Sequence, residues 1–185
     1  MGTNGFRMES IKKHIRTVQD FPIPGVLYRD ITSIIEDPDL FKSIMLDMCF
    51  AAHRFESDVV IGIESRGFIF GTPLSDKLHL PFIPARKPGK LPNETVSKSF
   101  DLEYGSTELH IQKLSPINGK VVIVDDLVAT GGTALACADL VHENWNIPKE
   151  NILILAVIDL PNLGGSAIIR EQGYNVKCIV DFDGD

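Results

Sequence analysis

The chain has 185 residues, of which 44% are hydrophobic and 23% charged, as in an ordinary soluble globular protein with one sizeable core. Its formal net charge of −7 argues against nonspecific binding to nucleic acid. No apolar run approaches the roughly 20 residues of a membrane span, so no membrane partner is expected. The three scattered cysteines favour free thiols in a cytoplasmic protein over disulfides or a metal site.

The first elements expected are a short amphipathic helix over residues 8–19 and an extended turn after it. Ile11 and Ile15 stand at helical spacing. The FPIPG that follows cannot be helical, because its prolines and glycine interrupt the backbone pattern. From spacing alone, we expect this stretch to be a loop that packs Phe21 and Tyr28 into a core.

Two strand and helix units come next. Asp37 and Pro38 are typical of a helix start, which predicts a helix to about residue 55. Residues 59–63 are apolar enough for a buried strand and lead through the tetrapeptide ESRG at 64–67 into a second helix. Residues 81–86 predict a third, short strand.

From residue 87 to residue 100 the chain turns polar, with prolines, a glycine and lysines. A stretch of this composition between strands is either a mobile lid or a solvated hairpin. Residues 95–104 and 108–112 could pair as the two arms of such a hairpin. The sequence alone leaves both interpretations open.

The stretch 121–134, VVIVDDLVATGGTA, joins a buried strand, two carboxylates and a loop of small residues before a helix. Gly131 and Gly132 allow a sharp turn and a close backbone approach to a ligand. Backbone N–H groups ahead of a helix form an anion site, while Asp125 and Asp126 suit hydroxyl groups or a hydrated cation. A phosphorylated sugar satisfies both requirements, and the alternative is an ordinary turn with two solvated aspartates.

Strands are also expected at 152–158 and 176–180, with a helix at 164–173 between them. This alternation predicts an α/β fold with a mostly parallel central sheet flanked by helices. Ligands of such sheets bind at the carboxyl ends of the strands, so the loops at 64–67, 86–90 and 125–133 should meet on one rim. Five basic residues on the rim and the neighbouring polar stretch would give an acidic protein a local anion site: Arg66, Arg86, Lys87, Lys90 and Lys98.

The stretch 121–134 resembles the phosphoribosyl pyrophosphate signature of the type I phosphoribosyltransferases. From about residue 9 to residue 182 the chain is similar to the adenine phosphoribosyltransferases of that family. The motifs that carry this resemblance are FPIPGVLYRDIT, ESRGFIFG, RKPGKLP, LEYGSTELHI and VVIVDDLVATGGTA. The resemblance implies one phosphoribosyltransferase domain over residues 1–185, with a base-binding hood at about 8–34 and a catalytic lid at 87–105.

The resemblance also implies a role for each matching residue. Asp125 and Asp126 would hold the ribose hydroxyls. The 5′-phosphate would be bound by Ala129, Thr130, Gly131, Gly132 and Thr133. Pyrophosphate would be bound by Glu64, Ser65, Arg66, Gly67, Arg86, Lys87 and Lys90, with a cis peptide at Glu64–Ser65. Adenine would be bound by Val26, Leu27, Tyr28 and Arg29. The catalytic residues would be Glu103, Arg66 and Tyr104, with Glu103 as the base.

The implied reaction transfers phosphoribose from phosphoribosyl pyrophosphate to N9 of adenine and gives AMP and pyrophosphate. Magnesium is expected as the cofactor, held through substrate oxygens and water and by no direct protein ligand, and a homodimer is expected. Two alternatives remain: a phosphoribosyltransferase for another base, or a ligand-sensing protein of the same fold without catalysis.

Overall fold

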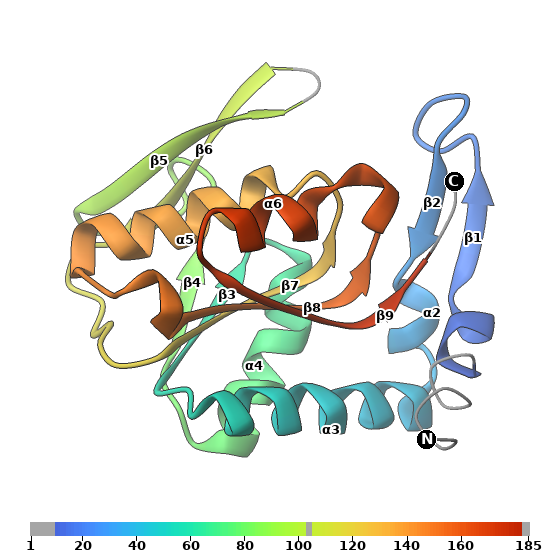
Figure 1. The fold of residues 1–185 in the computed structure, drawn as a ribbon, viewed down its shortest axis with the longest axis horizontal. Helices are drawn as coiled ribbons and strands as arrows, with labels where there is room; N and C mark the ends of the chain where they lie inside the picture. The colour runs from blue at the N-terminus through green and yellow to red at the C-terminus, as the bar shows by residue number, and fades with distance from the viewer. Residues whose placement is uncertain (1–9, 103–104, 183–185) are drawn as a thin grey trace.

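The computed structural model describes residues 10–102 and 105–182 (Figure 1). Its strands form a five-stranded sheet and two two-stranded sheets. The larger sheet has the order β4-β3-β7-β8-β9, and every neighbouring pair in it is parallel. Its strands are β3 (Val59–Ile63), β4 (Phe82–Ala85), β7 (Val121–Val128), β8 (Ile152–Asp159) and β9 (Asn175–Asp181). The expected parallel α/β architecture is confirmed.

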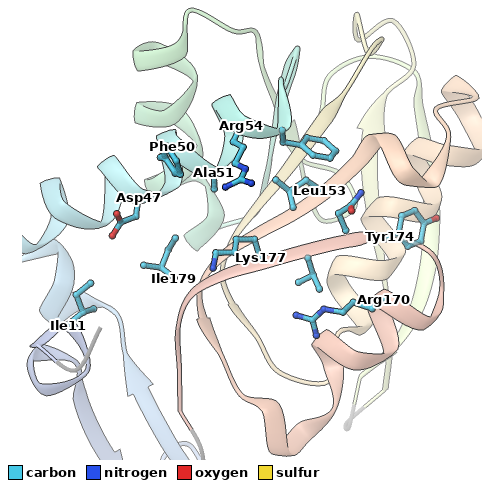
Figure 2. Close-up of a pocket in the computed structure, with 13 residues that line it drawn as sticks. Ile11, Asp47, Phe50, Ala51, Arg54, Leu153, Arg170, Tyr174, Lys177 and Ile179 are labelled. Carbon is cyan, nitrogen blue, oxygen red and sulfur yellow. The ribbon is translucent and has the colours of Figure 1, made fainter. Parts of the chain in front are cut away.

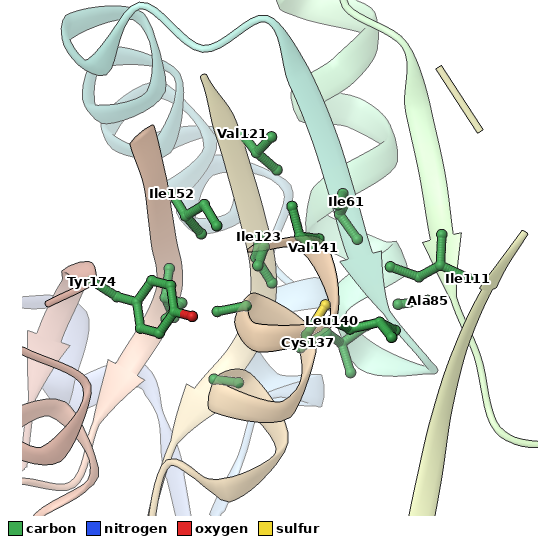
Figure 3. Close-up of a cluster of buried hydrophobic side chains, with 14 of the residues drawn as sticks. Ile61, Ala85, Ile111, Val121, Ile123, Cys137, Leu140, Val141, Ile152 and Tyr174 are labelled. Atoms are coloured by element: carbon green, nitrogen blue, oxygen red, sulfur yellow. The ribbon is translucent and has the colours of Figure 1, made fainter. Parts of the chain in front are cut away.

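Helices cover both faces of this sheet, so the side chains of the central strands alternate between two cores. On β7, Val121 and Ile123 pack toward α5 (Gly132–Trp145), beside which α6 (Gly165–Glu171) also lies (Figure 3). Val122 and Val124 pack instead toward α3 (Pro38–Phe55) and α4 (Arg66–Leu78). Two short 3-10 turns, Lys149–Asn151 and Pro161–Leu163, precede β8 and α6.

The start of α3 follows the prediction from sequence. The Asp37 side chain accepts hydrogen bonds from the backbone N–H groups of Asp39 and Leu40, and Pro38 occupies the first turn. The helix ends after Phe55, where Glu56 adopts a left-handed conformation at φ 59°. The predicted end at about residue 55 is confirmed.

The helix predicted over residues 8–19 is wrong in its second half. Helical structure covers residues 10–14, and Arg16–Gln19 is strand β1, antiparallel to β2 (Leu27–Asp30). Ile11 and Ile15 are buried, as the helical spacing required. Residues 16–19 leave the helical path because their backbone pairs with β2. The guanidinium of Arg16 is also paired with Asp30 at 2.9 Å and with Glu36 at 3.0 Å. The short helix α2 (Thr32–Ile35) follows β2.

The polar stretch after β4 leads into an antiparallel hairpin of β5 (Thr95–Leu102) and β6 (Gly105–Gln112). It is not a fully solvated hairpin, since Leu109 and Ile111 are buried and Phe100 packs against the core beside α5. Figure 1 shows the hairpin above α5 and the β1–β2 ribbon beside the end of β9. Among the described residues, no helix is both long and apolar enough to cross a membrane.

Candidate functional site

The three loops expected on one rim do meet at the carboxyl ends of the parallel strands. Two cavities lie there, of about 210 Å³ and 140 Å³. The first lies against residues 64–66 and the β5–β6 hairpin, and the second lies along the loop 127–134. Four residues line both cavities, namely Arg66, Asp125, Asp126 and Thr133. The acidic pair therefore stands between two adjoining spaces.

Strand β7 continues through the acidic pair instead of ending before it, because Leu127 and Val128 still pair with β8. Asp126 is only 2% exposed. Burial raises the pKa of Asp125 well above its ordinary value, and the neighbouring charge of Asp126 raises it further. Burial also raises the pKa of Asp126, although the positive charge of Arg66 opposes this shift.

Arg66 connects the acidic pair to the N-terminal ribbon. Its Nε lies 3.0 Å from Asp126 Oδ2, and its Nη1 donates a hydrogen bond of 2.8 Å to the hydroxyl of Tyr28. Tyr28 is in β2 and packs edge-on against Phe21 at 5.0 Å. One guanidinium thus joins the first turn of α4, the end of β7 and the ribbon.

Glu64 organises the basic loop that follows β4. Its carboxylate accepts a hydrogen bond of 2.9 Å from Arg86 Nη2 and another of 2.9 Å from the backbone N–H of Lys87. Arg86 also donates to the carbonyl of Lys90 at 3.1 Å. The hydrogen bond from Arg86 lowers the pKa of Glu64. The cis peptide expected at Glu64–Ser65 is present.

The loop at residues 129–133 is shaped by two glycines, one of which the sequence analysis missed. Gly131 has φ 84° and stands directly before α5. Gly165 packs against this loop, since its N–H donates to the Ala129 carbonyl at 3.1 Å. A Cβ at Gly165 would lie 2.6 Å from the Gly131 nitrogen and would clash with the Ala129 oxygen. The only signal in the sequence was the doubled glycine in NLGGS.

The remaining predicted residues fall in several places. Leu27 is half-buried in β2, and Val26 before it is 37% exposed. Arg29 donates a hydrogen bond of 2.5 Å to Thr17 and lies 4.4 Å above the ring of Phe182. Ser65 directly precedes α4 and lines the first cavity, and Gly67 lies in the first turn of α4. Thr130 and Gly132 line the second cavity.

Residues 103–104, which contain the predicted catalytic Glu103 and Tyr104, lie outside the described residues. The flanking hairpin supplies cavity residues that sequence reasoning missed: Phe100, Thr107, Glu108 and Leu109. Lys98 is not free for the rim anion site, because its ammonium is 2.5 Å from Glu143 and 3.9 Å from Asp139 on α5. These carboxylates raise the pKa of Lys98.

Comparisons with known proteins agree with this geometry. The family model described as "Phosphoribosyl transferase domain" matches residues 40–145, a region that runs from α3 through the acidic pair and α5. A parallel sheet with paired carboxylates and a loop of small residues before a helix is thus assigned to the phosphoribosyltransferase class.

More specific relatives cover nearly the whole chain. An adenine phosphoribosyltransferase of Agathobacter rectalis is 45% identical over 178 residues, 96% of this chain and 99% of the relative. The crystal structure of the enzyme from Thermoanaerobacter pseudethanolicus is 38% identical, with a TM-score of 0.84 and coverage of 95% and 99% of the two chains. The enzyme from Giardia lamblia, solved with 9-deazaadenine, is 28% identical, with a TM-score of 0.88 and coverage of 96% and 98%. The chain belongs to the adenine phosphoribosyltransferase family.

Proposed function

We propose that the protein salvages adenine by transferring phosphoribose from phosphoribosyl pyrophosphate to N9 of the base. The C1–oxygen bond to pyrophosphate breaks, the C1–N9 bond forms, and AMP and pyrophosphate leave. The observation that carries this proposal is the pair of adjoining cavities that meet at Asp125 and Asp126. One cavity lies along the loop 129–133, which we propose binds phosphate and call the anion loop. The other cavity lies beside Glu64 and its neighbours.

The sugar phosphate fits the second cavity. The loop 129–133 offers backbone N–H groups at the start of α5, where the helix dipole favours the 5′-phosphate. Asp125 and Asp126 would accept hydrogen bonds from the ribose hydroxyls. Their negative charge also stabilises the positive charge that develops at C1 as the leaving group departs.

Pyrophosphate fits the first cavity, which Arg66 and Lys87 line. Arg86 and Lys90 belong to the same loop, and Glu64 holds that loop in place. Magnesium, which we propose as the cofactor, would neutralise the leaving group. Among the described residues no group of three or more His, Cys, Asp or Glu side chains could hold a metal ion. We propose that the ion is bound through substrate oxygens and water, as Mg²⁺ often is at phosphates.

We propose that adenine binds under the β1–β2 ribbon, which would form the hood. A backbone N–H and C=O near Leu27 would read its 6-amino group, and a base with a 6-oxo group would leave them unpaired. Tyr28 already contacts the rim through Arg66. Glu103 on the proposed lid at 87–105 would accept the proton that adenine loses from N7, with Tyr104 beside it.

The test is incubation of the purified protein with adenine, phosphoribosyl pyrophosphate and magnesium, followed by chromatography for AMP. Hypoxanthine, xanthine and orotate serve as competing acceptors, because another base is the first alternative. Preference for one of these would refute the adenine assignment. Binding of phosphoribosyl pyrophosphate without any nucleotide product would favour the ligand-sensing alternative.

We also propose a homodimer in the cytoplasm. The free thiols of Cys49, Cys137 and Cys178 suit a reducing compartment. Light scattering on the eluting protein would give the mass in solution, and a monomer at micromolar concentration would refute the dimer.

A further inference from the structure

A second cavity system lies far from the rim in the fold. A groove of about 760 Å³ runs between α3 and β9, on the side of the sheet where α3 packs (Figure 2). Leu153 of β8 and Ile179 of β9 line its floor, and both belong to the core on the α3 side. This volume is in the range of pockets that bind small organic molecules.

The groove does not belong to the proposed reaction site. Leu153 and Asn175 stand at the amino ends of β8 and β9, whereas the rim lies at the carboxyl ends of the strands. None of the residues that line the groove also lines a rim cavity. A ligand in the groove would therefore leave the rim accessible.

Three cations from different elements surround the groove. They are Arg54 of α3, Arg170 of α6 and Lys177 of β9. Figure 2 shows Arg54 extending from α3 toward β9, the strand that carries Lys177. Within residues 10–102 and 105–182, the three side chains form neither an ion pair nor a hydrogen bond.

The absence of pairing is informative because carboxylates are in excess in this chain, with 25 against 18 basic residues. Rim cations such as Arg66 and Arg86 each have a carboxylate partner. One carboxylate, Asp47 of α3, also lines the groove, so the three cations outnumber the acidic groups there. Three cations around one groove, none of them within ion-pair distance of a described carboxylate, provide a complementary surface for a multiply charged anion.

The wall on α3 adds an apolar surface next to these charges. Phe50 is 66% exposed and lines the groove beside Ala51. An exposed phenyl ring can stack with a flat heterocycle. Docking of a second copy in a symmetric dimer would instead bring the same three cations of each chain to one interface. A small anion with a flat apolar part fits the groove better.

We propose that this groove binds a nucleoside triphosphate, with the triphosphate between Arg54, Arg170 and Lys177 and the base against Phe50. The proposal does not depend on the reaction at the rim. It adds a second nucleotide site, between α3 and the edge strand β9.

ATP titrated into the full chain with labelled isoleucine and leucine methyl groups tests this site by NMR. Shifts are expected at Leu153 and Ile179, with Ile63 of the rim as the contrasting reporter. The triple variant Arg54→Ala, Arg170→Ala, Lys177→Ala should raise the Kd for ATP by about tenfold or more, since charge-assisted contacts are lost. Binding of phosphoribosyl pyrophosphate to this variant should be unchanged, which also shows that it folds.

The matched control removes three positive charges elsewhere: Lys13→Ala, Lys42→Ala, Lys77→Ala. It should bind ATP like the wild type. Phe50→Ala should weaken ATP binding and leave the binding of inorganic triphosphate unchanged. The proposal is overturned if ATP does not bind, if its shifts are confined to the rim, or if both triple variants lose affinity equally. Equal affinity of the wild type for ATP and inorganic triphosphate would overturn the role of the base.

Discussion

At the scale of single residues, Arg66 joins two parts of the site that are distant in sequence. Its guanidinium spans Asp126 on β7 and the Tyr28 hydroxyl on β2. Arginine is suited to this position because its planar fork can serve two partners at once. Loss of the hydrogen bond to Tyr28 should therefore change the position of Arg66 beside Asp126.

Replacement of Tyr28 by phenylalanine removes one hydroxyl and keeps the ring against Phe21. Because the N–H donor is charged but partly exposed, the lost hydrogen bond is worth about 1 kcal/mol. We expect KM for adenine to rise by about fivefold, with kcat less affected, as steady-state kinetics would show.

Tyr174→Phe is the matched control, since it also removes a part-buried tyrosine hydrogen bond, of 2.6 Å, to Asp139 on α5. It should lower Tm by about 2–4 °C for each kcal/mol lost and leave KM unchanged. Equal kinetic effects of the two variants would contradict the role of Tyr28.

Asp125→Asn should stabilise the ligand-free protein at pH 8. The folded pKa of Asp125 is raised by burial, so keeping it ionised costs stability above that pKa. Scanning calorimetry would show this relief as a higher Tm of the variant than of the wild type. The gain should fade as pH falls through the folded pKa and vanish below the unfolded value near ~4.

The same variant should bind phosphoribosyl pyrophosphate about tenfold or more weakly, because hydrogen bonds to a charged acceptor are lost. Asp76→Asn on the exposed face of α4 is the control for removal of a charge. A stability gain that persists unchanged at low pH would show that ionisation of Asp125 is not its cause.

Glu103→Ala tests the proposed base. Loss of general-base catalysis should lower kcat by about 10²-fold or more, while KM for phosphoribosyl pyrophosphate stays close to that of the wild type. Glu94→Ala, at the surface pair with Lys113 beside the same hairpin, is the control. Unchanged turnover would remove Glu103 from the mechanism.

At the scale of elements, the sequence predicted a helix or strand correctly where interactions between neighbouring residues determine it. The span of α3 could be read from Asp37, Pro38 and its apolar pattern, because capping is a local interaction. The strand at Arg16–Gln19 could not, because it is set by pairing with β2 and by the ion pair of Arg16 with Asp30. These partner residues lie in β2, on the far side of the turn at residues 20–26, so the local sequence of residues 16–19 does not indicate the pairing.

In the candidate site, too, some features could be predicted from the sequence and others could not. The rim position of the acidic pair and of the loop at 64–67 follows from the rule that parallel strands present ligands at their carboxyl ends. The Arg66–Tyr28 contact and the packing of Gly165 depend on side chains and loops brought together by the whole fold. Local spacing carries no information about either.

Gly165→Ala tests the support that α6 gives to the anion loop. The added methyl would clash with the Ala129 carbonyl and the Gly131 nitrogen, so the loop or α6 must shift. We expect KM for phosphoribosyl pyrophosphate to rise by about tenfold, because the phosphate donors lose their alignment.

Gly164→Ala is the matched control. Gly164 has φ 76°, so alanine there is strained by about 1 kcal/mol, but its Cβ would have no neighbour within 4 Å among the described atoms. It should lower Tm and leave KM unchanged. If both variants raise KM alike, general loosening of the turn is the cause.

At the scale of the whole molecule, an acidic chain keeps its basic side chains near acidic ones at the rim. Arg66 is paired with Asp126 and Arg86 with Glu64. At the proposed site, substrate phosphates would compete with these carboxylates, and the proposed magnesium would compensate for the added negative charge. Substrate binding should therefore stabilise the assembled fold as a unit.

Phosphoribosyl pyrophosphate with magnesium, at about 100 times its Kd, should raise the stability by about 2.7 kcal/mol. For a chain of this size that is a Tm increase of about 5–10 °C in a thermal shift measurement. The Asp125→Asn variant at the same concentrations should show a smaller increase. An equal increase in both would mean that the stabilising ligand does not contact the acidic pair.

The described strands are divided among three separate sheets, and the β1–β2 ribbon is one of them. It touches the rest of the site through side chains such as Tyr28 and Arg29, which reach Arg66 and Phe182. Substitutions in the ribbon can therefore accumulate without altering the strand register that carries the anion loop. During evolution, changes in the ribbon could therefore alter which base is accepted, while the proposed sugar-phosphate site on the five-stranded sheet stays the same.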